Sequence, residues 1–221
     1  MDSVPIKGRA LTIITVLATL GAVVVAISRV IGRYHLPEVP PGYDLRLVED
    51  WREYSGPQED RATGRIRMVV FSDYLCGACS SSAPIIRKFE SEFPEAVEVR
   101  WRHFPMLGAR SFDAALAAEC VREGGGFEAF HDALLSLRDS IGKKPWVEMA
   151  QMVGVTDTAG FSRCLRDSAA ADAVMEDREA GRALGIRGVP SVLVDSLLFF
   201  GLPELRYLRA YARKAAPPPP R

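Results

Sequence analysis

The chain has 221 residues, of which 48% are hydrophobic and 25% charged, so its composition is that of a globular protein rather than a disordered one. Its 28 Lys and Arg residues balance its 28 Asp and Glu residues, which removes the basic excess expected of a nucleic-acid-binding protein. The length accommodates one domain of ordinary size with an appendage, and we expect no nucleic-acid partner.

An uncharged apolar run lies near the start of the sequence. Residues 10–28 ("ALTIITVLATLGAVVVAIS") hold nineteen residues without a charge, and such a helix would reach roughly 28 Å, about the thickness of the hydrocarbon core of a bilayer. The run predicts a transmembrane helix that anchors the chain in the lipid bilayer, within a tail and anchor at residues 1–32. A cleaved secretion signal is the alternative, because Ala26 and Ser28 are small residues that a signal peptidase accepts, but the run is longer than a typical signal core. Basic residues flank both ends of the run, so the charge pattern does not orient it.

Turn-forming residues dominate the next stretch, residues 33–64, which we interpret as a tether and peripheral arm with one short helix at residues 48–54. The run "RIRMVVF" at residues 65–71 then predicts a buried strand. Two cysteines follow, and the spacing of apolar residues in "SSAPIIRKFESEF" predicts a helix after them. A second strand is predicted at residues 97–104 ("VEVRWRHF"). The order strand, cysteine pair, helix, strand is typical of an α/β fold with a parallel pair of strands.

The middle of the sequence is helical, from about residue 109 to residue 184. Glycines at residues 124–126 separate two apolar helical stripes. Further helical patterns cover residues 145–153, 159–166 and 168–184. These patterns predict a helical insertion within the α/β domain.

Strand patterns return near the end of the sequence. Residues 191–194 and 197–200 are expected to form a hairpin whose turn is made by Asp195 and Ser196. A last amphipathic helix follows, and the sequence closes on a Pro-rich tail at residues 213–221.

The two cysteines after the first strand, Cys76 and Cys79, could be metal ligands, a structural bridge or a redox pair. Structural zinc usually takes four Cys or His ligands, often as two paired motifs. The remaining cysteines and the histidines stand singly along the sequence: Cys120, Cys164, His35, His103 and His131. We therefore expect no metal site, and we expect His103 and His131 to have structural roles.

The redox interpretation of the pair has a physical mechanism. If the helix begins at the motif, its free backbone N–H groups and its dipole favour a thiolate on Cys76 and make that residue the nucleophile. Cys79 lies three residues later on the same helical face, so it can reach the Cys76 sulfur and resolve a mixed disulfide. The strand–CxxC–helix context is the one that such a motif requires.

Five segments in this order resemble the periplasmic thiol–disulfide oxidoreductases of the DsbA type. They are "FSDYLCGAC", "RHFPML", "AALAAEC", "FEAFHDALL" and "ALGIRGVPSVLVDSLLFFG". The resemblance implies a thioredoxin-like fold at residues 65–212, with an inserted all-helical subdomain at about residues 109–184. It also implies that the domain faces the periplasm or another extracytoplasmic space, either tethered by the predicted anchor or secreted after signal cleavage.

The resemblance assigns roles to individual residues. Cys76 matches the attacking thiol, Cys79 the resolving thiol, and Pro190 the cis-proline that faces them. Val189, the residue before that proline, matches the position that presents its backbone to the substrate. The implied partners are exported cysteine-containing proteins and a membrane redox partner, with no cofactor beyond the Cys76–Cys79 disulfide.

The sequence departs from the family pattern at two places. The dipeptide between the cysteines is Gly77–Ala78, where the enterobacterial oxidase has Pro-His, so one source of thiolate stabilisation is missing. Relatives with a thioredoxin fold commonly carry a carboxylate where this chain has Val70. Asp73 is closer to the pair and is a candidate for proton transfer, although a role as a turn residue at the strand end is favoured.

Cys120 and Cys164 lie on apolar helical stripes and could be two buried free thiols. The even number of cysteines, together with the oxidising compartment that the resemblance implies, favours a disulfide between them instead.

We therefore predict a monomeric, membrane-tethered thiol–disulfide oxidoreductase that acts as an oxidase. A reductase fed by a membrane electron donor is the alternative within redox chemistry. A copper-binding module or a chaperone-like peptide binder is the alternative outside it.

Overall fold

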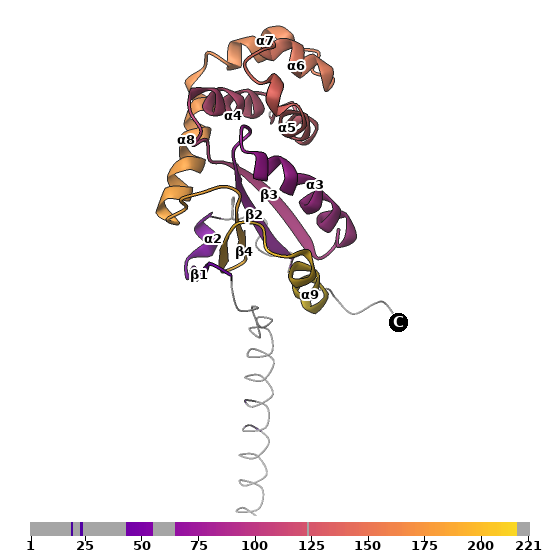
Figure 1. Cartoon of the computed structure of the whole chain (residues 1–221), viewed down its shortest axis with the longest axis vertical. Coiled ribbons are helices and arrows are strands. Elements are labelled where there is room, and N and C mark those ends of the chain that lie inside the picture. The colour runs from indigo at the N-terminus through magenta and orange to yellow at the C-terminus, as the bar shows by residue number, and fades with distance from the viewer. Residues whose placement is uncertain (1–18, 20–22, 24–42, 55–64, 123, 216–221) are drawn as a thin grey trace, which may run out of the picture. The chain divides into compact units, whose positions relative to one another are not determined.

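The computed structural model describes residues 43–54, 65–122 and 124–215, together with Thr19 and Val23 (Figure 1). Their strands form a five-stranded sheet in the order β1-β5-β4-β2-β3. The strands are β1 (Leu45–Leu47), β2 (Ile66–Ser72), β3 (Val97–His103), β4 (Ser191–Val194) and β5 (Leu197–Phe200). The helices are α2 (Trp51–Tyr54), α3 (Gly77–Glu92), α4 (Ala109–Arg122), α5 (Phe127–Ser136), the 3-10 helix η2 (Arg138–Ser140), α6 (Trp146–Met152), α7 (Thr158–Cys164), α8 (Ser168–Ala183) and α9 (Leu205–Ala215).

Strand β2 lies inside the sheet, parallel to β3 on one side and antiparallel to β4 on the other. All seven of its residues are buried. A strand that is buried on both faces has a continuous apolar sequence rather than alternating apolar and polar residues. This explains the pattern "RIRMVVF". The predicted parallel strand–helix–strand unit is confirmed, with both strands within one residue of their expected limits.

Helices α4 to α8 form the helical insertion that the sequence predicts. Figure 1 shows α4 to α7 gathered beyond one end of the sheet, while α8 runs back alongside it. A disulfide joins Cys120 of α4 to Cys164 of α7, with the two Cα atoms 5.6 Å apart. This is the pairing that the sequence analysis favoured, and it links two helices of the insertion directly.

The return of α8 to the sheet depends on a glycine. A Cβ atom built on Gly181 would stand 2.5 Å from two ring atoms of Phe104 and 3.3 Å from Phe71. Both phenylalanines are buried in the core, and their rings meet edge to face at 6.3 Å. The absence of a side chain at residue 181 therefore permits the close approach of helix and sheet.

The assignment of residues 33–64 to a tether and peripheral arm needs correction. Within that stretch, β1 pairs antiparallel with β5, with Leu45 opposite Phe199, and Val48 is buried in the same core as Phe71. A three-residue strand among turn formers has no periodicity long enough to detect, because its stability comes from pairing with a distant strand.

The predicted hairpin is confirmed. Strands β4 and β5 are antiparallel neighbours, and Asp195 in their turn has φ 48°. Aspartate tolerates this left-handed conformation better than most residues because its short side chain forms local hydrogen bonds. Here that carboxylate accepts hydrogen bonds from the Arg67 backbone N–H and from the Tyr211 hydroxyl, which ties the turn to β2 and α9.

The predicted transmembrane helix at residues 10–28 lies almost wholly outside the described residues. Within the part of the chain that the structure describes, no helix is both long and apolar enough to cross a bilayer. Residues 213–215 of the predicted Pro-rich tail belong instead to α9, and residues 216–221 lie outside the described residues.

Candidate active site

Cys76 lies in the turn between the end of β2 and the start of α3. It is the N-cap residue of α3, and its sulfur accepts a hydrogen bond from the backbone N–H of Cys79 at 3.4 Å. The sulfur thus takes the place that the side-chain oxygen of Ser or Asp usually has in a helix cap. The positive end of the helix dipole also points at this sulfur.

A distant segment completes the surroundings of Cys76. The peptide bond between Val189 and Pro190 is cis, directly before β4. The Cys76 thiol donates a hydrogen bond to the Val189 carbonyl at 3.4 Å. The structure therefore brings together the CxxC motif and the Val-Pro pair, which the resemblance alone had connected.

The two cysteines, both free thiols in this structure, differ sharply in their surroundings. Cys76 is half-buried, whereas the side chain of Cys79 is 1% exposed. Burial raises the pKa of the Cys79 thiol to about 12, although a hydrogen bond from the backbone of Asp73 acts in the opposite direction. Cys76 is therefore the sulfur that solvent and substrates can reach, and Cys79 is held as a protonated thiol behind it.

Asp73 is buried in the turn before the cysteine pair. One carboxylate oxygen accepts a hydrogen bond from the backbone N–H of Leu75, and the other accepts two, from Met106 and Leu107. These bonds fix the turn against the loop that follows β3, so the geometry favours the turn role over proton transfer. They also hold the loop so that Met106 and Leu107 are 43% and 53% exposed beside the turn.

A buried aromatic cluster packs against the turn that carries the cysteine motif. The Tyr74 hydroxyl and the His131 Nδ1 atom are 2.9 Å apart, and the His131 ring lies 4.2 Å from the Trp101 ring. Burial raises the pKa of Tyr74 well above its ordinary value and lowers the pKa of His131 well below its own. His131 is therefore uncharged, and its hydrogen bond with Tyr74 joins α5 to the turn that carries Cys76, which is consistent with its expected structural role.

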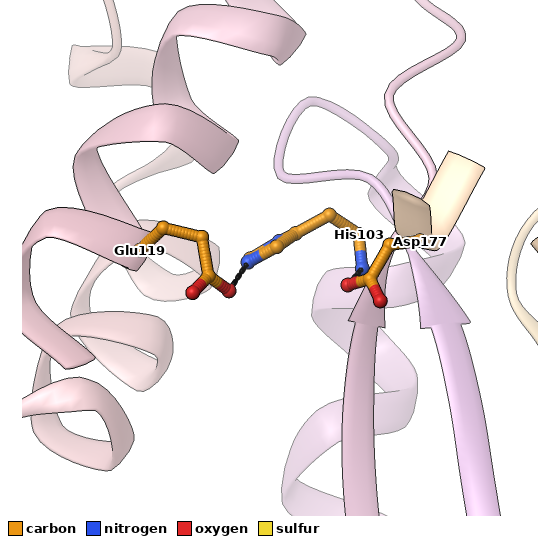
Figure 2. A group of neighbouring side chains, drawn as sticks. All are labelled: His103, Glu119 and Asp177. Atoms are coloured by element: carbon orange, nitrogen blue, oxygen red, sulfur yellow. Dashed lines mark hydrogen bonds and ion pairs between the residues drawn. The ribbon is translucent and has the colours of Figure 1, made fainter. Parts of the chain in front are cut away.

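His103 belongs to a second polar group, which links the insertion to the sheet (Figure 2). Its Nε2 atom is 2.7 Å from Glu119 of α4, and its backbone N–H donates to Asp177 of α8 at 2.8 Å. Burial raises the pKa of Glu119, but hydrogen bonds with His103 and Arg122 outweigh that effect and lower the pKa to about 2. Asp177 also pairs with Arg102. Because these carboxylates already have cationic partners within the protein, the group is suited to joining β3, α4 and α8 rather than to holding a metal ion.

No pattern in the sequence predicted that Arg138 lies beside the cysteine motif. Arg138 of η2 reaches Gly77, the first residue between the cysteines: a Cβ atom at Gly77 would stand 2.5 Å from the Arg138 Nη1 atom. Residue 138 lies far along the sequence, between two predicted helices, and only the packing of the insertion on α3 brings it to the motif.

Comparison with known proteins agrees with this geometry. The model of the DSBA-like thioredoxin domain family matches residues 67–212. The crystal structure of a thioredoxin-like oxidoreductase from Silicibacter pomeroyi DSS-3 is similar with a TM-score of 0.58 and 25% sequence identity, covering 80% of this chain and 93% of that one.

Two relatives differ in how much of their length is matched. The Na(+)/H(+) antiporter NhaA 1 of Mycolicibacterium vanbaalenii is 28% identical over 170 residues, which is 73% of this chain but 26% of the antiporter. The chain thus spans about a quarter of the length of that relative. The probable disulfide bond formation protein D of Bacillus anthracis is 21% identical over 145 residues, covering 60% of this chain and 66% of that protein.

The family match spans the cysteine pair, the helical insertion and the Val-Pro segment, and the fold is thioredoxin-like with a helical insertion. The chain belongs to the DSBA-like thioredoxin domain family.

Proposed function

We propose that the protein oxidises cysteine pairs of exported proteins through a Cys76–Cys79 disulfide. The observation that carries the proposal is the position of the Cys76 sulfur, between the N-terminus of α3 and the carbonyl of Val189. A sulfur held there is open to attack on one side, and its thiolate is stabilised when it leaves. Met106 and Leu107 supply exposed apolar side chains nearby, which suit an unfolded substrate chain.

The proposed cycle balances without a cofactor. A substrate thiolate attacks the Cys76 sulfur, the Cys76–Cys79 bond breaks, and the electron pair goes to Cys79, which takes up a proton. A second substrate thiolate then attacks the substrate sulfur of the mixed disulfide and releases Cys76 as a thiolate. The substrate loses two electrons as its two thiolates become a disulfide, and the protein gains those electrons as the Cys79 thiol and the Cys76 thiolate, which becomes a thiol when it takes up a proton from solvent.

We also propose that the domain works outside the cytosol, tethered by the apolar segment at residues 10–28 and reoxidised by a membrane redox partner. The Cys120–Cys164 disulfide supports this proposal, because structural disulfides persist mainly in oxidising compartments. The similarity to a protein named for disulfide bond formation supports the oxidising direction.

The Cys79→Ser variant, produced in the native host, tests the exchange mechanism. In this variant the Cys76 thiolate attacks a disulfide of an exported protein, the second sulfur of that disulfide leaves as a thiolate, and no Cys79 thiol is present to displace the protein from Cys76, so protein adducts linked to Cys76 should accumulate. Non-reducing gels and mass mapping of the linked peptides would identify them, and the Cys76→Ser, Cys79→Ser double variant is the control. If no protein is trapped on Cys76, the exchange mechanism is wrong.

The direction of exchange is tested separately by the reduction potential of the pair. The Gly77–Ala78 dipeptide lacks the histidine of the strongly oxidising relative, and this favours a reductase as the second candidate. Equilibration with glutathione buffers measures the potential. A value near that of the strong oxidases, about −120 mV, supports oxidation, whereas a value near that of thioredoxin, about −270 mV, supports reduction.

A further inference from the structure

The space beside Gly77 is occupied by a guanidinium group. The position that a Cβ atom would take on Gly77 lies 2.5 Å from Nη1 of Arg138 and 3.7 Å from its Cζ. Gly77 is the first residue of α3 and directly follows Cys76. A permanent positive charge therefore lies against the N-terminal turn of the helix that carries the reactive sulfur.

Contacts between α3 and the end of α5 hold Arg138 in this place. The Ser80 hydroxyl donates to the Leu135 carbonyl at 2.7 Å, which joins the first turn of α3 to the last turn of α5. The chain then turns into η2, where the Leu137 N–H donates to Ala133 at 2.8 Å and the Ile141 N–H donates to the Arg138 carbonyl at 3.1 Å. The backbone of Arg138 is thus fixed relative to the motif.

The ion pair that Arg138 makes is a weak one. Its Nε atom is 3.5 Å from a carboxylate oxygen of Asp139, whose side chain is 88% exposed. Exposed pairs of this kind are screened by water and salt and contribute little. Asp139 therefore does little to neutralise the guanidinium, whose own side chain is 37% exposed.

We propose that Arg138 is a positioning residue for disulfide exchange, which stabilises the thiolate of Cys76 from its place over Gly77. On this account residue 77 is glycine because any side chain there would displace the guanidinium. The insertion thereby supplies a cationic charge beside a CxxC motif whose own dipeptide, Gly77–Ala78, contains none. This inference rests on the proposed function only in taking Cys76 as the exchanging sulfur.

The stabilised thiolate matters at a defined step of the cycle. When the second substrate thiolate attacks the mixed disulfide, the bond between the substrate sulfur and Cys76 breaks, and the electron pair leaves on Cys76. A thiolate that is better stabilised leaves faster. Loss of the Arg138 charge should therefore slow release of the oxidised substrate and make the disulfide less oxidising.

The test measures the rate at which iodoacetamide alkylates Cys76 of the reduced full chain as a function of pH. Arg138→Gln should move the midpoint of this profile to higher pH by about half a unit, so that alkylation below both midpoints is about threefold slower. Arg138→Lys keeps the charge and should retain most of the wild-type profile. The difference between wild type and Arg138→Gln should shrink as salt is added.

A second variant separates this electrostatic role from a structural one. Gly77→Ala places a Cβ where Nη1 now lies; since the displaced atom is the end of a flexible side chain, the fold should survive while the guanidinium moves away. Gly77→Ala should give the same midpoint shift as Arg138→Gln, and the double variant should show no additional shift. The matched control is Arg166→Gln, an exposed arginine elsewhere in the insertion, which should leave the profile unchanged.

Superposition of the Arg138→Gln profile on the wild-type profile at low salt would overturn the inference, as would fully additive shifts in the double variant. If Arg138→Gln does not fold, the comparison of wild type with Gly77→Ala decides in the same way. The proposed function fails by a different result, namely that the wild-type protein does not exchange disulfides with reduced substrates at all.

Discussion

Cys76 and Cys79 are separated by two residues, yet the structure assigns them opposite properties. The first sulfur caps α3 and is half-buried, while burial raises the pKa of the second thiol to about 12. This asymmetry suits a pair in which one sulfur meets substrates and the other closes the disulfide from inside.

The burial of His131 makes the stability of the fold depend on pH. His131 must stay uncharged in the fold, where its burial and the nearby charges of His103, Arg87 and Arg122 lower its pKa. In the unfolded chain its pKa returns to about 6.5, so below that pH the unfolded state binds more protons than the folded state. The stability due to neutral His131 is therefore complete above about pH 6.5 and is lost as the pH falls below it.

His131→Asn tests this account, because asparagine keeps a hydrogen-bonding partner for Tyr74 but does not titrate. Between pH 6.5 and pH 5, the free energy of unfolding of the wild-type protein should fall more steeply than that of the variant, by up to about 1.4 kcal/mol per pH unit. Urea unfolding at a series of pH values measures both slopes, and contributions common to the two proteins cancel. Parallel curves would contradict a buried neutral His131.

At the scale of elements, two helical glycines serve different purposes. Gly181 lets α8 approach the sheet, since its missing side chain leaves room for the buried Phe104 ring, whereas Gly77 faces the flexible end of the Arg138 side chain. Alanine in place of a helical glycine normally stabilises a helix by about 1 kcal/mol. The neighbours of each glycine decide whether that gain survives.

Gly181→Ala should lower the free energy of unfolding by about 1–3 kcal/mol, because the added methyl group must push apart α8 and the Phe104 ring. Gly77→Ala is the matched comparison and should leave that free energy unchanged or raise it. Urea unfolding at neutral pH measures both. A Gly181→Ala protein as stable as the wild type would show that helix and sheet are not closely packed at this point.

The elements that the sequence predicts well are those with a local signal. Strand β2, the helix after the cysteines and the helices of the insertion follow from hydrophobic periodicity, and the hairpin follows from its turn residues. Strand β1 could not be predicted because its three residues are ordered only by pairing with β5. The contact of Arg138 with Gly77 could not be predicted from the sequence either, since it arises from the packing of η2 against α3 and from no pattern in either segment.

For the whole molecule, the sheet and the insertion meet at the candidate site. The α3 and cis-proline segments supply Cys76, Cys79 and Val189, and the insertion supplies His131 beneath the motif and Arg138 beside it. The polar group of His103, Glu119 and Asp177 fixes the two parts to each other (Figure 2). The insertion is thus a component of the site rather than an appendage to it.

The central claim is that Cys76 and Cys79 form the redox couple, and electron transfer from a reduced substrate tests it most directly. The oxidised protein would be mixed with a reduced, unfolded protein that has two cysteines, the reaction stopped with acid, and the disulfides of both partners mapped by mass spectrometry. One substrate disulfide should form for each Cys76–Cys79 disulfide lost, through an intermediate linked at Cys76, and Cys76→Ser should abolish the reaction. Substrate oxidation by Cys76→Ser at the wild-type rate, or an intermediate linked at any other cysteine, would contradict the account.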